Sequence, residues 1–104
     1  MKNLTPQEAE KVVKLIAELT FIAKQLDDLE DKLIDKLDDD DEEAHSILDD
    51  AIDAADIQYK KIGEEISSIG GFDLMQYCIK KIPNDKDAHS VINAAWDGIN
   101  SWQV

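Results

Sequence analysis

The sequence predicts an all-α fold, a small helical bundle in which a long antiparallel, coiled-coil-like helical hairpin is covered by two shorter C-terminal helices. Two long stretches carry apolar residues three and four positions apart, which is the spacing of amphipathic helices. Only four glycines and two prolines interrupt the 104 residues. No stretch keeps the period of two that a half-buried strand requires. The length suits one domain with one core, over residues 1–104.

The first helix is expected over about residues 6–37. Thr5 is a good N-cap, Pro6 suits the first helical position, and Glu8 can close a capping box with Thr5. The apolar positions that follow alternate three and four apart, as in a heptad seam held for three repeats. This first seam consists of Val12, Leu15, Leu19, Ile22, Leu26, Leu29 and Leu33.

A second helix is expected over about residues 42–69, with Asp40 or Asp41 as its cap and Gly70-Gly71 as its stop. Two helices of nearly equal length with a short polar connection predict an antiparallel hairpin with the aspartate run at its tip. The second seam consists of Leu48, Ile52, Ala55, Tyr59, Ile62, Ile66 and Ile69.

The last third predicts two shorter helices, over about residues 73–82 and 85–102, and a three- or four-helix arrangement stays open. Asp73 is the expected cap of the first of them, and Pro83 ends it. Trp96 lies at the edge of the apolar face of the last helix. Core packing is the expectation for it, and a partner contact is the alternative. That face consists of Ala88, Ile92, Ala95, Ile99 and Trp102.

The net charge of −13 is concentrated in the 30 residues from Asp27 to Asp56, which hold 15 carboxylates and two lysines. The other 74 residues hold nine carboxylates and nine lysines, which cancel. Clustered like charges repel one another and destabilise a compact state, so this concentration indicates a surface for a basic partner. A solvated helix face that serves only solubility is an equally weighted interpretation.

The charge density of this stretch approaches that of a nucleic acid. In the predicted hairpin, about 15 residues of each helix span roughly 22 Å. Thirteen net charges over that length correspond to roughly one per 1.7 Å, which is about the value for duplex DNA. The predicted partner-binding residues are Asp27, Asp28, Asp31, Asp35, Asp38, Asp39, Asp40, Asp41, Glu42, Glu43, Asp49, Asp50, Asp53 and Asp56.

Several functional classes are not expected. The negative charge and the absence of arginine argue against direct nucleic-acid binding. No nucleophile has an evident base partner and no phosphate-binding loop is present, so neither an enzyme nor a cofactor is predicted. The run from Asp38 to Glu43 lacks the spacing of an EF-hand, and His45 with His89 is a weak basis for zinc, so no metal is predicted. Cys78, the only cysteine, is expected to be buried.

The location expected from the sequence is the cytoplasm. No apolar run approaches the length of a membrane span, and the start lacks the apolar region of a signal peptide. A membrane contact is therefore not predicted. For a phage-encoded protein the location would be the cytoplasm of the host cell.

These observations predict a small acidic inhibitor that imitates nucleic-acid phosphates and blocks the basic groove of a nucleic-acid-binding protein or nuclease. In charge and size the chain is similar to phage-type anti-restriction and anti-CRISPR proteins and to nuclease-immunity proteins, although no motif connects it to any of them. The alternative is a coiled-coil adaptor or oligomerisation module, a homodimer included, in which the acidic face only confers solubility.

Overall fold

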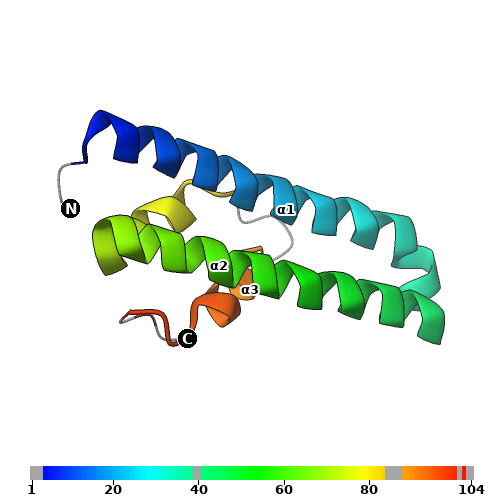
Figure 1. Cartoon of the computed structure of the whole chain (residues 1–104). Coiled ribbons are helices and arrows are strands. Elements are labelled where there is room, and N and C mark those ends of the chain that lie inside the picture. Colours follow the sequence, from blue (N-terminus) through cyan, green and yellow to red (C-terminus); the bar gives the residue numbers. More distant parts are fainter. Residues whose placement is uncertain (1–3, 39–40, 84–87, 101, 103–104) are drawn as a thin grey trace.

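The structure, a computed structural model, describes residues 4–38, 41–83, 88–100 and 102. Within these ranges the chain forms three helices and no strand: α1 (Pro6–Asp38), α2 (Glu42–Lys80) and α3 (Ala88–Trp96). The helices α1 and α2 lie side by side as an antiparallel hairpin, and α3 packs against α2 (Figure 1). The predicted all-α fold with a long hairpin is confirmed. The molecule is elongated, with extents of 50 × 23 × 18 Å.

The predicted capping box begins α1. The Thr5 backbone N–H donates to Glu8 Oε1 at 3.0 Å, and the Glu8 backbone N–H donates to Thr5 Oγ1 at 3.1 Å. Two backbone donors that a helix start leaves unpaired are satisfied in this way. Pro6 occupies the first helical position, where the absence of an N–H costs nothing.

The start of α2 is capped by Asp41, one of the two predicted candidates. Its Oδ1 accepts hydrogen bonds from the backbone N–H groups of Glu43 at 3.0 Å and Ala44 at 3.2 Å. Asp39 and Asp40 lie outside the described residues, as do the side chains of Leu37 and Asp38.

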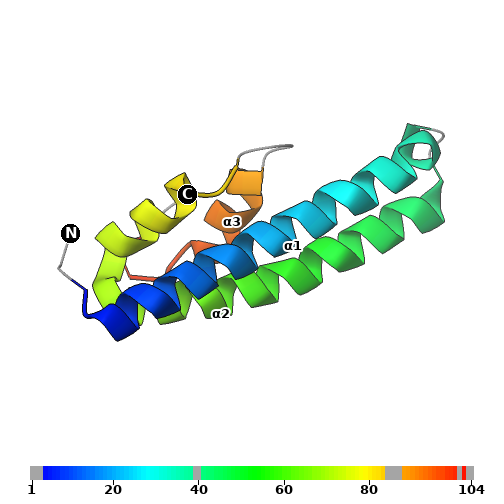
Figure 2. The ribbon, with the colours of Figure 1, turned by 90° about the horizontal axis from the view of Figure 1, so that it is seen from above.

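Gly71 breaks α2 into two parts. Its φ of 72° and ψ of −158° are not helical, and this region of backbone space is open essentially to glycine alone. Residues 72–80 therefore turn back over the hairpin instead of continuing along its axis (Figure 2). The sequence correctly located a stop here, but Asp73 lies in the first turn after the break and not at its cap. The non-helical residue before this segment is Gly71, two positions before Asp73, so the prediction of Asp73 as the cap is wrong.

The last helix is shorter than the predicted span of 85–102. It ends at Trp96, and residues 97–100 form turns. Gly98 and Asn100 have φ values of 89° and 55°, and an α-helix cannot continue through such left-handed residues. Ile99 and Trp102 are nevertheless buried, as their apolar character predicted. Residues 84–87, where the predicted start of this helix falls, lie outside the described residues.

The core lies where α3 and residues 72–80 meet the hairpin. Trp96 is fully buried, and its Nε1–H donates to the Tyr59 carbonyl at 2.7 Å. A Cβ atom on Gly63 would lie 2.5 Å from Trp96 Nε1, so the absence of a side chain at Gly63 allows this close approach. The expectation of core packing for Trp96 is confirmed, and a partner contact is excluded because no part of the residue is exposed.

The two predicted seams close against each other within one chain. Leu19 and Ile66 are fully buried, whereas Leu29 and Leu48, nearer the tip, are only half-buried. The tip-side half of the hairpin extends past α3 and residues 72–80 (Figure 2). The hairpin therefore has one half inside a packed core and another half made essentially of two helices.

Candidate acidic interaction surface

We define the acidic end as the part of the hairpin formed by residues 27–38 and 41–56. Eight predicted contact residues in it have exposed side chains: Asp28, Asp31, Asp35, Glu42, Glu43, Asp49, Asp50 and Asp53. Three others are half-buried: Asp27, Asp41 and Asp56. The side chain of Asp38 and all of Asp39 and Asp40 lie outside the described residues. The described acids thus stand on the protein surface, where a partner can reach them.

The hairpin brings the acids of its two arms together. Leu26 and Leu29 of α1 line one pocket with Ala51 and Ala55 of α2, so these stretches lie opposite each other. Along α1, Asp27, Asp31 and Asp35 follow one another four residues apart, which places them on one side of the helix, about 6 Å between neighbours. A similar row on α2 consists of Asp49, Asp53 and Asp56.

The pockets on the two sides of the acidic end differ in charge. A cavity beneath α3 is lined by Asp27 and Glu30 along with apolar residues. A second pocket at the same level of the hairpin, lined by α1 and α2 residues alone, contains no carboxylate. Lys32 and Lys36, the two lysines of this stretch, lie seven and eleven positions after Gln25, which lines the second pocket. Helical spacing therefore puts both lysines on the side of the second pocket, whereas Asp27 and Glu30 line the cavity beneath α3.

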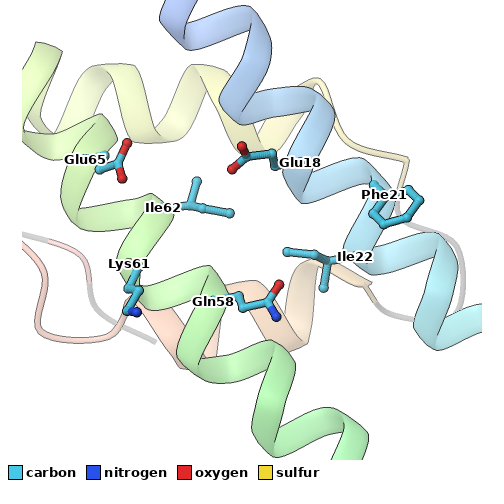
Figure 3. Close-up of a pocket in the computed structure, with 7 residues that line it drawn as sticks. All are labelled: Glu18, Phe21, Ile22, Gln58, Lys61, Ile62 and Glu65. Carbon is cyan, nitrogen blue, oxygen red and sulfur yellow. The ribbon is translucent and has the colours of Figure 1, made fainter.

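A groove with an apolar floor continues along this side towards the N-terminus of α1, and Glu18, Lys61 and Glu65 also line it (Figure 3). Its floor is formed by Ile22 and Ile62, and Phe21 stands at its edge with 62% of its surface exposed. Gln58 and Ile22 line both the groove and the uncharged pocket, so the two are continuous. Figure 3 shows α3 and residues 72–80 behind the hairpin, on the other side.

The cavity beneath α3, hereafter the Tyr59 cavity, has a volume of about 160 Å³. The Tyr59 side chain is fully buried, and its hydroxyl has no hydrogen-bond partner. Burial, followed by the negative charge of Asp27, raises the pKa of Tyr59 to about 12. The residues that line the cavity are Ala23, Leu26, Asp27, Glu30, Leu48, Ile52, Tyr59, Ala88, Ser90 and Val91.

Sequence reasoning missed Tyr59 and Glu30 as candidate site residues. Tyr59 occupies a seam position, where an aromatic residue is expected to be part of the hydrophobic core. Glu30 is one of 15 carboxylates in the stretch from Asp27 to Asp56, and nothing in its spacing distinguishes it. A signal did exist, because a tyrosine inside an otherwise aliphatic seam buries a hydroxyl that needs a partner. Which groups face that hydroxyl depends on where α3 docks, and the spacing of the residues does not contain that information.

The remaining candidates have ordinary structural roles. Cys78 is buried, and burial raises the pKa of its thiol to about 11, so it packs as a small apolar side chain. His89 Nε2 lies 2.6 Å from the Ile82 carbonyl oxygen. No group of three or more potential metal ligands comes together among the described residues. None of the helices in the described part of the chain is long and apolar enough to span a membrane.

Comparison with protein-family models, with curated protein sequences and with solved structures found no match to this chain. The functional argument therefore depends on the geometry and the charge of the chain itself.

Proposed function

We propose that this protein is a small acidic inhibitor whose acidic end occupies the basic groove of a nucleic-acid-binding protein or nuclease in place of nucleic-acid phosphates. Anti-CRISPR, anti-restriction and nuclease-immunity proteins are the kinds of inhibitor that this activity would match. The cytoplasm, or the host-cell cytoplasm for a phage-encoded protein, is the location that such a target implies.

One observation carries the proposal: the exposed carboxylates stand on the half of the hairpin that extends beyond the packed core. Among the described side chains of residues 29–51, only Leu33 and Ala44 are buried. Eleven carboxylates fall within residues 29–51, more than such a small surface needs to stay in solution. A protruding two-helix rod can also enter a groove without rearrangement of the core.

Electrostatic attraction would bring the acidic end to a basic groove and hold it there. A basic groove has a positive potential that attracts the acidic end at long range and increases the rate of association, and this attraction weakens as salt increases. Once bound, the carboxylates pair with lysine and arginine side chains that would otherwise bind phosphates. Nucleic acid and this protein then compete for the same cations, so inhibition should be competitive with nucleic acid.

A pull-down from a cell lysate tests the proposal, with charge variants that differ only in position. The acidic-end variant carries Asp28→Asn, Asp35→Asn, Asp50→Asn and Asp53→Asn, four exposed sites. The control variant makes the same charge change at four exposed sites outside the acidic end, with Glu10→Gln, Glu64→Gln, Asp73→Asn and Asp97→Asn.

The expected result is retention of basic nucleic-acid-binding proteins at low salt and their release by salt or by added duplex DNA. The acidic-end variant should lose most of this retention, and the control variant should keep it. A partner that is retained equally by both variants and resists both salt and DNA would contradict the proposal. A purified target should then be inhibited competitively with its nucleic acid.

The uncovered groove, with the exposed Phe21 at its edge, favours a second candidate function, an adaptor or oligomerisation module. The seams themselves are used inside the chain, so such a contact would use the groove and Phe21 instead. Phe21→Ser should then abolish self-association in sedimentation measurements. Val13→Ser is the matched control, since Val13 is similarly exposed, at 66%, and does not line the groove.

A further inference from the structure

The Tyr59 hydroxyl is an exception to the usual satisfaction of buried polar groups. It has no hydrogen-bond partner although Tyr59 is fully buried. A buried hydroxyl without a partner costs about 1–3 kcal/mol, and such a group calls for an explanation such as a bound ligand or water. Tyr59 faces a cavity, so a guest in that cavity could supply the missing hydrogen bond.

The size of the Tyr59 cavity suits a small organic group. Its volume of about 160 Å³ compares with an engineered cavity of about 150 Å³ that binds benzene, a ligand with six carbon atoms. Leu26, Leu48 and Ile52 provide aliphatic walls from both arms of the hairpin, and Val91 closes the cavity from α3. An unbranched chain of about four carbons fits such walls.

The polar groups in the cavity select a cation. The Tyr59 hydroxyl can accept a hydrogen bond, and the carboxylates of Glu30 and Asp27 are half-buried in the same lining. None of the described residues that line the cavity is basic. A primary ammonium donates three hydrogen bonds and carries the opposite charge, whereas water leaves the aliphatic walls without a partner.

We propose that the Tyr59 cavity binds a primary alkylammonium group, with its aliphatic stem against Leu26 and Ile52 and its ammonium at the side formed by the Tyr59 hydroxyl and the Glu30 carboxylate. Two sources share this chemistry, a free aliphatic amine and the side chain of a lysine in another protein. Binding of a free amine does not require the basic protein partner proposed above.

An NMR titration with n-butylammonium chloride tests this assignment. Saturable shifts are expected for the backbone amides of Ala23, Ile52 and Val91, which come from the three helices around the cavity. Neutral n-butanol, which has the same stem, and tetramethylammonium, which has no N–H donor, should each bind at least about tenfold more weakly, because a hydrogen bond to a charged group is lost.

Variants test which side chains form the site. Tyr59→Phe removes only the hydroxyl and should weaken n-butylammonium binding at least about tenfold without lowering the melting temperature, since an unpartnered group is removed. Glu30→Gln should weaken binding to a similar degree. Asp35→Asn is the matched control: it removes the same charge from an exposed site on α1 and should change binding less than about twofold.

The assignment is overturned if n-butanol binds as tightly as n-butylammonium, or if Asp35→Asn weakens binding as much as Glu30→Gln. The first result would mean apolar binding alone, and the second a diffuse counterion effect. A capped acetyl-Gly-Lys-Gly-amide peptide separates the two sources. Displacement of n-butylammonium by this peptide assigns the cavity to a protein lysine, and binding of the free amine alone assigns it to a small molecule.

Discussion

The indole Nε1–H of Trp96 donates to the backbone carbonyl of Tyr59 at 2.7 Å, and this bond joins α3 to the middle of α2 across 37 residues of sequence. The Tyr59 carbonyl lies within α2, where it also accepts the helical hydrogen bond from the backbone N–H four residues later. A carbonyl oxygen has two lone pairs and can accept both hydrogen bonds. Trp96 also stacks edge-on against Trp102, with ring centroids 5.0 Å apart. Trp96 therefore helps to fix the position of α3, and with it the Tyr59 cavity, together with the buried Ile92 and Ala95.

Gly63→Ala should destabilise the protein. The added Cβ would lie 2.5 Å from Trp96 Nε1 and 2.6 Å from its Cδ1, so the indole must move and its bond to Tyr59 must weaken. Overpacking of this kind costs about 1–3 kcal/mol in the free energy of unfolding, measured by urea denaturation. The matched control is Ser68→Ala at an exposed site of the same helix. Alanine is a better helix former than glycine, so an increase in stability for Gly63→Ala would contradict the packing described here.

Gly71→Ala should also destabilise the protein, for a different reason. Only Asn100 Nδ2 at 3.6 Å is close to the added Cβ, so the space is sufficient. The cost comes from the backbone, because φ is 72° at this position and a residue with a side chain pays about 1–3 kcal/mol there. Urea denaturation measures the loss. Gly71→D-Ala, made by chemical synthesis, favours positive φ and should recover most of it. Equal loss for both isomers would contradict a backbone origin.

Added salt should stabilise the protein. Raising the ionic strength from about 0.01 M to about 0.15 M shortens the Debye length from about 30 Å to about 8 Å, which screens repulsion among the carboxylates of the acidic end. We expect the melting temperature to rise by about 4–8 °C, equivalent to about 1 kcal/mol for a domain of this size. Circular dichroism at 222 nm, the usual helix signal, follows the transition.

The charge variants described above serve as controls for this salt effect. The acidic-end variant should melt higher at low salt and respond less to added salt than the wild type. The variant neutralised at Glu10, Glu64, Asp73 and Asp97 should respond nearly as the wild type does. Equal responses from both variants would mean that the repulsion is spread over the whole chain.

Stability should fall between about pH 9 and pH 12. The pKa of Cys78 rises from 9.0 to about 11 and that of Tyr59 from 10.0 to about 12 on folding, so the folded state holds both protons more tightly. Each raised pKa therefore contributes to the free energy of unfolding. This contribution is fully present below the unfolded-state pKa and is lost as the pH rises through the folded-state pKa. Each is on the order of 2 kcal/mol. Urea denaturation across this range measures the loss.

Variants separate the two alkaline contributions. Cys78→Ala should remove the part of the decline between about pH 9 and 11, and Tyr59→Phe the part between about pH 10 and 12. A decline of the same steepness in Tyr59→Phe would contradict the contribution assigned to Tyr59.

Local chemistry explains which parts of the fold were predictable. The capping box at Thr5 and Glu8, the cap at Asp41 and the break at Gly71 each depend on a few neighbouring residues, and the sequence located all three. The seams were also visible, because burial repeats with the helix period. The last helix was predicted six residues too long at its C-terminal end, because its apolar face continues through Ile99 and Trp102 while the backbone turns at Gly98 and Asn100.

The candidate sites were less predictable because they depend on contacts between distant segments. The acidic end follows directly from composition and a hairpin, and the sequence identified its residues. Which of its acids lie beside α3 follows from the side that α3 covers, and buried residues such as Ile92 and Trp96 hold α3 there. The Tyr59 cavity requires the same docking, so neither feature could be derived from the spacing of the residues alone.

The break at Gly71 determines which part of the hairpin the C-terminal segments cover. Because residues 72–80 turn back, they and α3 leave the tip of the hairpin, past Glu30 and Leu48, uncovered (Figure 2), and among its described side chains only Leu33 and Ala44 are buried. Substitutions on the acidic end can therefore accumulate with little penalty to folding. The pattern of surface charges at the tip can therefore change while the sequence that maintains the core stays the same.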